Sequence, residues 1–113
     1  MTVDVVVPRR STKEIGLVEG NLVVDDATVR AEKDGEVIRV KGMTDCRDDC
    51  VFESSLVTSE LRGNDGEVLV EGDLTAERSI KIKRGDLEVR GNLASSRVEV
   101  DRRVEVSGNM DVE

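Results

Sequence analysis

The stretch VEGDLTAERSIKIKRGDLEVRGNL, residues 70–93, decides the fold of this chain. It contains one short phrase twice: an apolar residue, any residue, Gly, then Asn or Asp, then another apolar residue. The full phrase occurs at residues 18–22, 70–74, 89–93 and 106–110, and a shortened form occurs at residues 85–87. The last three full copies start 19 and 17 residues apart. Repetition of this length indicates a stack of near-identical turns rather than one closed core.

Apolar residues around these phrases come in pairs separated by one polar residue, as in Ile80-Lys81-Ile82 and Val98-Glu99-Val100. A period of two is typical of short strands with one buried face. Gly, Asn, Asp and Ser, which favour turns, lie between the pairs. Three such strands and their turns account for one coil of 17–19 residues.

In this register the expected inward positions form three columns. The columns are Cys50, Val68, Leu87 and Val104; Ile38, Leu56, Leu74, Leu93 and Met110; and Met43, Leu61, Ile80 and Val98. Left-handed hexapeptide helices keep a stricter six-residue period than the drifting spacing seen here. We therefore predict an all-β fold, a right-handed parallel β-helix: a triangular solenoid of five to six coils of about 17–19 residues. The β-helix domain is expected to span residues 17–113, preceded by a separate segment over residues 1–16.

The glycines of the repeated phrase are expected to stack at one corner of the prism. A corner between two short strands usually needs a residue with positive φ, which Gly adopts without steric cost. A phosphate-binding loop is the alternative for these glycines, but the lysine and the following helix that it needs are missing. On the outer faces we expect Lys81 to stack on Glu99, and Glu88 on Glu105, where Arg90 or Arg103 would have to offset the repulsion.

The composition argues against an enzyme. The 113 residues include no His, Trp or Tyr, so the commonest general base and metal ligand are absent. We expect no catalytic residues, no cofactor and no metal. Among the acidic residues, the run Asp45, Asp48 and Asp49 is the one place to look for a cation, although a solvated corner loop is the simpler interpretation. The formal net charge of −8 argues against a nucleic-acid partner.

Two cysteines, Cys46 and Cys50, lie four residues apart. A disulfide between them would close a very small loop, and zinc would need further ligands. We therefore predict two free thiols in a reducing cytoplasm, with Cys50 filling the core. No signal peptide and no apolar run of transmembrane length are found in the sequence. The expected location is cytoplasmic, with membrane association as an option.

The segment before Leu22 contains a valine cluster followed by Pro8 and basic residues. Three interpretations stay open: a strand that caps the first coil, a flexible tail, or a weak contact with an anionic membrane surface. The candidate membrane-contact residues are Val3, Val5, Val6, Val7, Arg9 and Arg10.

The Val-x-Gly-Asn/Asp-Leu phrases, with the pairs Ile80-Lys81-Ile82 and Val98-Glu99-Val100, resemble the repeats of bactofilins, polymer-forming cytoskeletal proteins built on a right-handed triangular β-helix. The resemblance covers residues 17–113. It implies filaments formed without nucleotide by end-to-end stacking of β-helices, and a short disordered N-terminal tail that often contacts the membrane. Residues 43–57 depart from the pattern because they lack the glycine phrase. The pattern is also interrupted at Glu113, so the last coil is either open or continued in a longer repeat protein.

The ends of the stack are the expected assembly surfaces, because terminal coils leave unpaired backbone groups over apolar side chains. The expected C-terminal interface is Val98, Val100, Val104, Val106, Met110 and Val112. The expected N-terminal interface is Leu17, Leu22, Val24 and Val29. If both ends associate with further copies of the chain, a filament forms, and such a filament would scaffold cell shape or organisation.

The alternative is a dimeric β-helix interaction module of the division-regulator type that binds a cell-envelope or division protein. A trimeric sugar-nucleotide acyltransferase is the least favoured class, because His and a strict six-residue period are absent.

Overall fold

The computed structural model describes residues 4–33 and 36–112, and every regular element in that part of the chain is a strand. All strand pairings are parallel, so the chain winds as a β-solenoid, which confirms the predicted fold class. The strands are β1 (Val5–Val7), β2 (Thr12–Glu14), β3 (Leu17–Val18), β4 (Leu22–Asp25), β5 (Thr28–Arg30), β6 (Val37–Arg47), β7 (Cys50–Phe52), β8 (Ser55–Asn64), β9 (Glu67–Val70), β10 (Leu74–Lys83), β11 (Asp86–Val89), β12 (Leu93–Ser95), β13 (Val98–Val100), β14 (Val104–Val106) and β15 (Met110–Val112). No helix of the length and apolarity needed to cross a membrane is found in the described residues.

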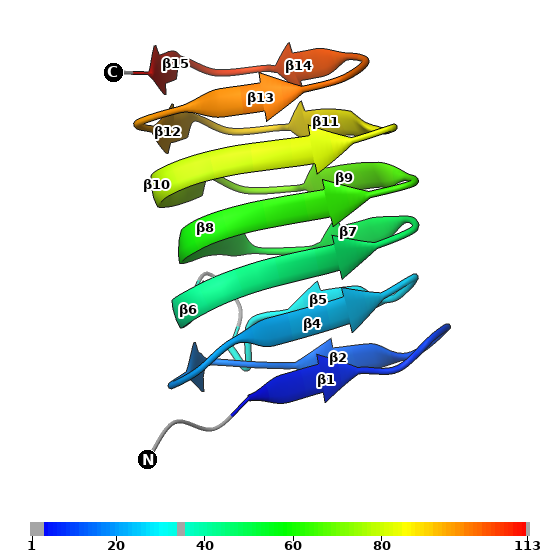
Figure 1. The fold of residues 1–113 in the computed structure, drawn as a ribbon. Coiled ribbons are helices and arrows are strands. Elements are labelled where there is room, and N and C mark those ends of the chain that lie inside the picture. Colours follow the sequence, from blue (N-terminus) through cyan, green and yellow to red (C-terminus); the bar gives the residue numbers. More distant parts are fainter. Residues whose placement is uncertain (1–3, 34–35, 113) are drawn as a thin grey trace.

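The strands form three faces that wind into six coils. The first face is a six-stranded sheet in the order β14-β11-β9-β7-β5-β2. A nine-stranded sheet supplies the other two faces, because β6, β8 and β10 bend at one corner without a break. The second face contains β3, β12 and β15 with the first halves of these long strands, and the third contains β1, β4 and β13 with the second halves. In Figure 1 the near strands run to the right and the far strands to the left as the chain rises, which makes the coil right-handed.

Two of the predicted columns are confirmed by the register. Cys50, Val68, Leu87 and Val104 pair in succession on the first face. Ile38, Leu56, Leu74, Leu93 and Met110 do so on the second. The predicted outer pairs Lys81–Glu99 and Glu88–Glu105 are also present, and Arg90 and Arg103 lie 3.4 and 3.6 Å from Glu88 and Glu105.

The third column is correct from Leu61 to Val98, but its first member is wrong. Thr44, not Met43, pairs with Leu61, and Thr44 is fully buried. The reason is a bulge at the bend of β6, which places one extra residue between Val40 and Met43 relative to β8. Because the side-chain period is two, one extra residue exchanges the inward and outward positions. Thr44 is tolerated inside because its hydroxyl oxygen lies 2.9 Å from that of Thr58.

The stacked glycines have a different role from the one expected. Gly72, Gly91 and Gly108 do stack, since the N–H of Gly91 donates to Gly72 at 3.0 Å and that of Gly108 to Gly91 at 2.9 Å. None of these three glycines has a φ in the left-handed region. Instead the positive φ values lie at another corner, at Arg10, Asp26, Asp48, Asp65 and Arg84.

Close approach is what requires glycine in the repeated phrase. Asp73 Oδ1 accepts a hydrogen bond from the N–H of Asn92 at 2.8 Å, and Asn92 Oδ1 accepts one from the N–H of Asn109 at 2.8 Å. Each of these side chains packs directly against the glycine of the next coil, so a Cβ at Gly91 would collide with Asp73 Oδ1. The Gly-Asx phrase is therefore a ladder in which each Asx side chain binds the next coil.

Candidate assembly surfaces at the ends of the solenoid

The C-terminal coil is formed by β13, β14 and β15, one strand on each face. The six residues expected at this interface occupy its inward positions, in register with buried residues of the coil below. They are only partly covered: Val98, Val100, Val104 and Val106 are half-buried. Met110 and Val112 are 48 % and 43 % exposed, whereas Leu93, directly below Met110, is 1 % exposed. The last coil thus covers the core, and nothing in the described residues covers the last coil.

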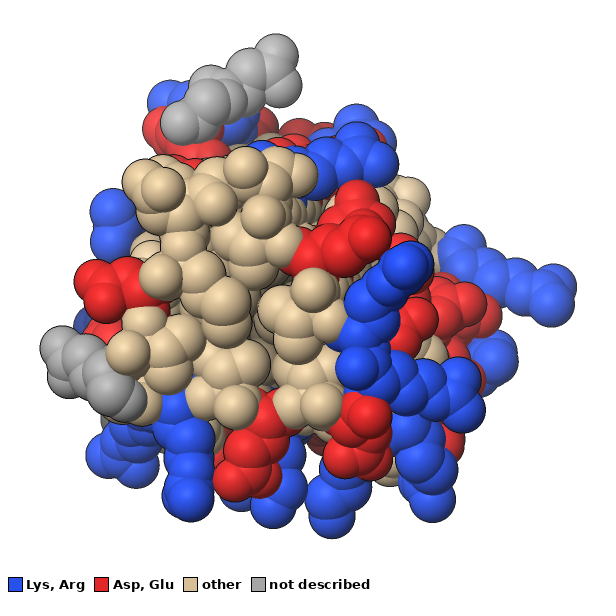
Figure 2. Space-filling model, turned by 90° about the horizontal axis from the view of Figure 1, so that it is seen from above, with Lys and Arg blue, Asp and Glu red and all other residues tan. Residues whose placement is uncertain are grey.

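The backbone at this end is also open. Among the described strands, β13 pairs with β10, β14 with β11 and β15 with β12, and each has no neighbour on its other edge. Figure 2 looks down on this end and shows an uncharged surface in the middle, with charged side chains along most of its rim. Arg97 pairs with Glu99 at 3.3 Å, and Arg103 with Glu105 at 3.6 Å, on the outer sides of β13 and β14. An uncharged centre within a charged rim is the usual arrangement of a protein interface.

The predicted N-terminal interface needs correction. Leu22, Val24 and Val29 are fully buried, because β1 pairs with β4 and β2 pairs with β5, which places a further coil below them. Leu17 does belong to the first coil and is 52 % exposed, but it pairs with exposed Arg39 and so lies on the outer side of the second face. Of the three interpretations of this segment, the capping strand is correct, since β1 pairs with β4, but the sequence did not show a complete further coil because Pro8 and the basic residues after it hid the alternation.

The first coil differs from the last in the character of its inward positions. Val7, Ile15 and Val18 are buried, with at most 5 % exposure. On the first face, Lys13 of β2 pairs with fully buried Val29, so a lysine occupies a core register position, and Lys13 is exposed. Sequence reasoning overlooked Lys13 because the spacings in this column, 16 residues from Lys13 to Val29 and 23 from Val29 to Phe52, depart from the coil length of 17–19 residues.

The residues proposed for membrane contact do not form a free tail. Val7 is fully buried and Val5 packs partly against the core, so the flexible-tail interpretation is wrong for the strand β1. Val6 is 59 % exposed on the outer side, and Val3 lies outside the described residues. Arg9 lies within 3.4 Å of Asp25, 3.6 Å of Asp26 and 2.9 Å of Asp48, and Arg10 is an exposed corner residue.

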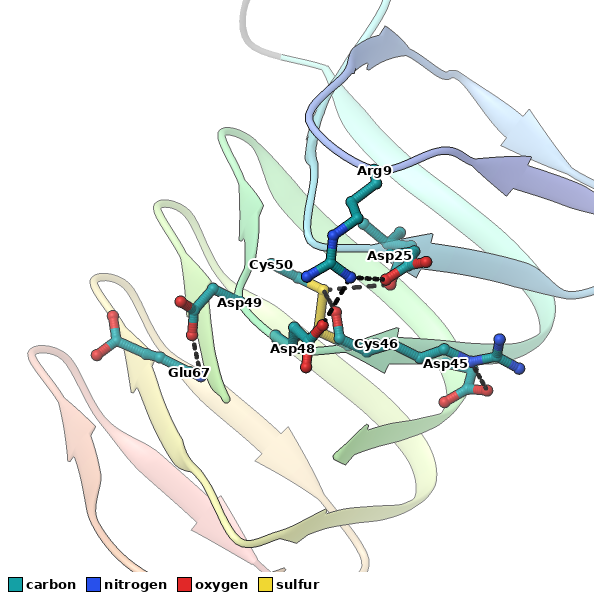
Figure 3. The surroundings of a disulfide bond; sticks show 10 residues. Arg9, Asp25, Asp45, Cys46, Asp48, Asp49, Cys50 and Glu67 are labelled. Carbon is teal, nitrogen blue, oxygen red and sulfur yellow. Dashed lines mark hydrogen bonds and ion pairs between the residues drawn. A yellow bond between two sulfur atoms is a disulfide. The ribbon is translucent and has the colours of Figure 1, made fainter. Parts of the chain in front are cut away.

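The two cysteines are not free thiols. Cys46 and Cys50 form a disulfide with their Cα atoms 6.1 Å apart, which corrects the prediction made from the sequence (Figure 3). Both residues point inward on either side of the corner, and Asp48 between them has a φ of 58°, which folds the chain back and brings them together. Cys50 fills the core as expected. Because the two thiols are paired, the cysteines do not indicate a reducing cytoplasm.

The acidic run beside this disulfide does not converge on one point (Figure 3). Asp45 pairs with Arg47 at 3.8 Å, Asp48 with Arg9, and Asp49 accepts a hydrogen bond from the N–H of Glu67 at 2.8 Å. The hydrogen bond from Arg9 to Asp48 raises the pKa of the guanidinium. No group of three His, Cys, Asp or Glu side chains that could hold a metal occurs in the described part of the chain.

A second column of acidic residues lies along the edge of the first face. Partial burial raises the pKa of the Glu67 carboxyl most, and the neighbouring carboxylates of Glu88 and Asp86 raise it further. Asp86 pairs with Glu67 in the register of β11 and β9. Like charges are thus stacked one coil apart.

No protein-family model, no curated protein and no solved structure matches this chain.

Proposed function

We propose that this chain is a structural protein that self-assembles through the ends of its β-solenoid, without nucleotide, and acts as a scaffold. The single observation that carries the proposal is the open C-terminal coil, where six inward apolar residues lie half-buried or exposed beside unpaired strand edges. Proteins normally protect such edges by covers, prolines or inward charges. Fully burying four exposed aliphatic side chains is worth roughly 6–12 kcal/mol before the cost of association, and the residues of this coil, which are already about half covered, would gain about half of that.

The proposal assigns the chain no catalytic activity and no cofactor. Its partner is a second copy of itself, and contacts with a membrane surface or with a cell-envelope or division protein would be additional. A nucleic-acid partner is disfavoured by the net charge of −8. A cytoplasmic location stays a proposal, and the disulfide argues against it, because such bonds persist mainly in oxidising compartments.

Two forms of assembly are candidates. The filament that the bactofilin resemblance implies needs both ends to stack, and in its favour β1, β2 and β3 also have one unpaired edge in the described residues. The dimeric interaction module needs only one end. Lys13, at a core position of the first coil, favours the dimer, because it makes the N-terminal end less apolar than the C-terminal end.

Negative-stain electron microscopy with sedimentation velocity, at low and moderate salt and with no nucleotide, tests the proposal. Filaments or dimers support self-assembly, and a monomer at every concentration contradicts it. Val106→Arg, at the open end, should abolish association while the strand content in circular dichroism is kept. Thr75→Arg adds the same charge on the outer side of the second face, away from the ends, and should leave association unchanged.

A further inference from the structure

Lys13 stands at the bottom of an otherwise apolar column. The column continues through Val29, Phe52, Val70, Val89 and Val106, each paired in register with the next. All members between Lys13 and Val106 are fully buried. The column therefore begins with an ammonium group at one end of the solenoid and ends with a half-buried valine at the other.

An inward charge on a terminal strand opposes further strand addition. In the free chain the Lys13 side chain is exposed, so its charge is solvated. A coil stacked below β2 would place an apolar side chain against Lys13 and remove water from the ammonium group. Burial of a charge without a partner is strongly unfavourable.

We propose that Lys13 closes the N-terminal end of the solenoid to coil stacking, so that two copies associate through their C-terminal coils and growth stops at a dimer. This inference rests on the proposed function and specifies its partner, its contact surface and its limit. A self-complementary contact between identical surfaces closes after two copies, whereas a head-to-tail contact continues.

A second copy, end to end about a two-fold axis, fits the C-terminal end better than a copy arranged head to tail. A head-to-tail joint that continues the register places Lys13 against Val106. A two-fold joint pairs the free edge of β14 with its copy in antiparallel fashion; with Val104 at the centre it places Val104 against Val104, and Val106 opposite the exposed corner residue Arg102. With Val104 at the centre of that pairing, Arg103 of each copy lies opposite Glu105 of the other, which is a favourable cross-strand pair. Arg103 and Glu105 already lie 3.6 Å apart on the outer side of one copy.

The test is the mass of the 113-residue chain by sedimentation equilibrium, compared with Lys13→Val, Lys13→Arg and Val106→Arg. We expect wild type and Lys13→Arg to be dimers and Val106→Arg to be a monomer. Lys13→Val should open the second end to stacking. Its average mass should then exceed that of the dimer by more than about twofold and should rise with protein concentration. Lys13→Thr, which removes the charge but adds no large apolar group, is the second variant if Lys13→Val precipitates, and should also exceed the dimer.

The outcomes separate this inference from the proposed function. Wild-type polymers would overturn the closed dimer but leave self-assembly in place. A dimeric wild type whose Lys13→Val and Lys13→Thr variants both stay dimeric would refute the role of Lys13. A monomeric wild type would remove self-assembly and the inference with it.

Discussion

At the scale of single residues, the Gly-Asx phrase works through side-chain hydrogen bonds between coils. Asp73 and Asn92 each accept a backbone N–H from the coil above, and the glycine above leaves room for them. Asn21 does the same at a different corner, between the second and third faces, where it accepts the N–H of Met43 at 2.9 Å beside Gly42. The phrase therefore ties neighbouring coils together, which a residue chosen only for its φ would not do.

Gly91→Ala should lower the free energy of unfolding by about 1–3 kcal/mol, because its Cβ would overlap Asp73 Oδ1 and lie 2.8 Å from the carbonyl oxygen of Gly72. Urea unfolding followed by circular dichroism measures this change. Gly16→Ala is the matched control, since its Cβ would meet only the movable end of the Glu32 side chain, at 3.2 Å. Equal stability losses in the two variants would contradict the ladder.

Glu67 makes stability depend on pH. Its pKa is raised in the folded state, so the ionised form destabilises the fold above that pKa, and the penalty fades as the pH falls through it. Glu67→Gln should therefore melt at a higher temperature than wild type at about pH 7, and the difference should disappear towards about pH 4. Glu36→Gln, which removes one negative charge at an exposed position in another part of the chain, is the control for the change in net charge.

At the scale of elements, the long strands β6, β8 and β10 carry two faces each, and the corner before β7 carries the disulfide. The same corner holds Arg9 of the first coil against Asp25 and Asp48 of the next two coils. A covalent bond and an ion-pair cluster thus meet where the glycine phrase is missing. The disulfide constrains one corner within a single coil, whereas the Asx ladder ties neighbouring coils together at another corner.

Reduction of the disulfide should destabilise the chain by about 2 kcal/mol, because the bond closes a small loop in the unfolded state. Thermal melts with and without a reductant measure the loss. The double variant Cys46→Ala/Cys50→Ala should start at the lower stability and should not respond to the reductant. A wild type that is equally insensitive would mean that the cysteines act as packing residues alone.

At the scale of the whole molecule, the six stacked coils form a solenoid whose two ends differ in how apolar they are. The C-terminal end is apolar and half-covered, and the N-terminal end has an inward lysine beside buried Val7, Ile15 and Val18. The faces between the ends alternate in charge and include paired Arg and Glu residues. Association is therefore favoured along the axis of the solenoid and disfavoured on its sides.

Association should strengthen as salt is added. Each copy has a formal net charge of −8, and screening reduces the repulsion between two copies while leaving apolar burial intact. Sedimentation at about 0.02 M and about 0.15 M sodium chloride should show the dissociation constant falling at the higher concentration. Dissociation at the higher salt would show that ionic contacts, such as Arg103 with Glu105, dominate the joint.

The fold class, the coil length and most of the core could be predicted from the amino-acid pattern alone. Period-two alternation and the recurring phrase are local properties, and parallel stacking converts them directly into columns such as Ile38, Leu56, Leu74 and Leu93. The six inward residues of the last coil were predicted for the same reason. Their role in assembly stays a prediction.

The features that depend on how one coil packs on another could not be predicted from the sequence pattern. A single extra residue in the bend of β6 placed Thr44, not Met43, inside, and the repeat spacing does not report such a bulge. The disulfide depended on a corner conformation at Asp48 that brings two inward cysteines together. The first coil and its inward Lys13 became visible only through the pairing of β1 with β4 and of β2 with β5, because non-local contacts, not local patterns, place them in the stack.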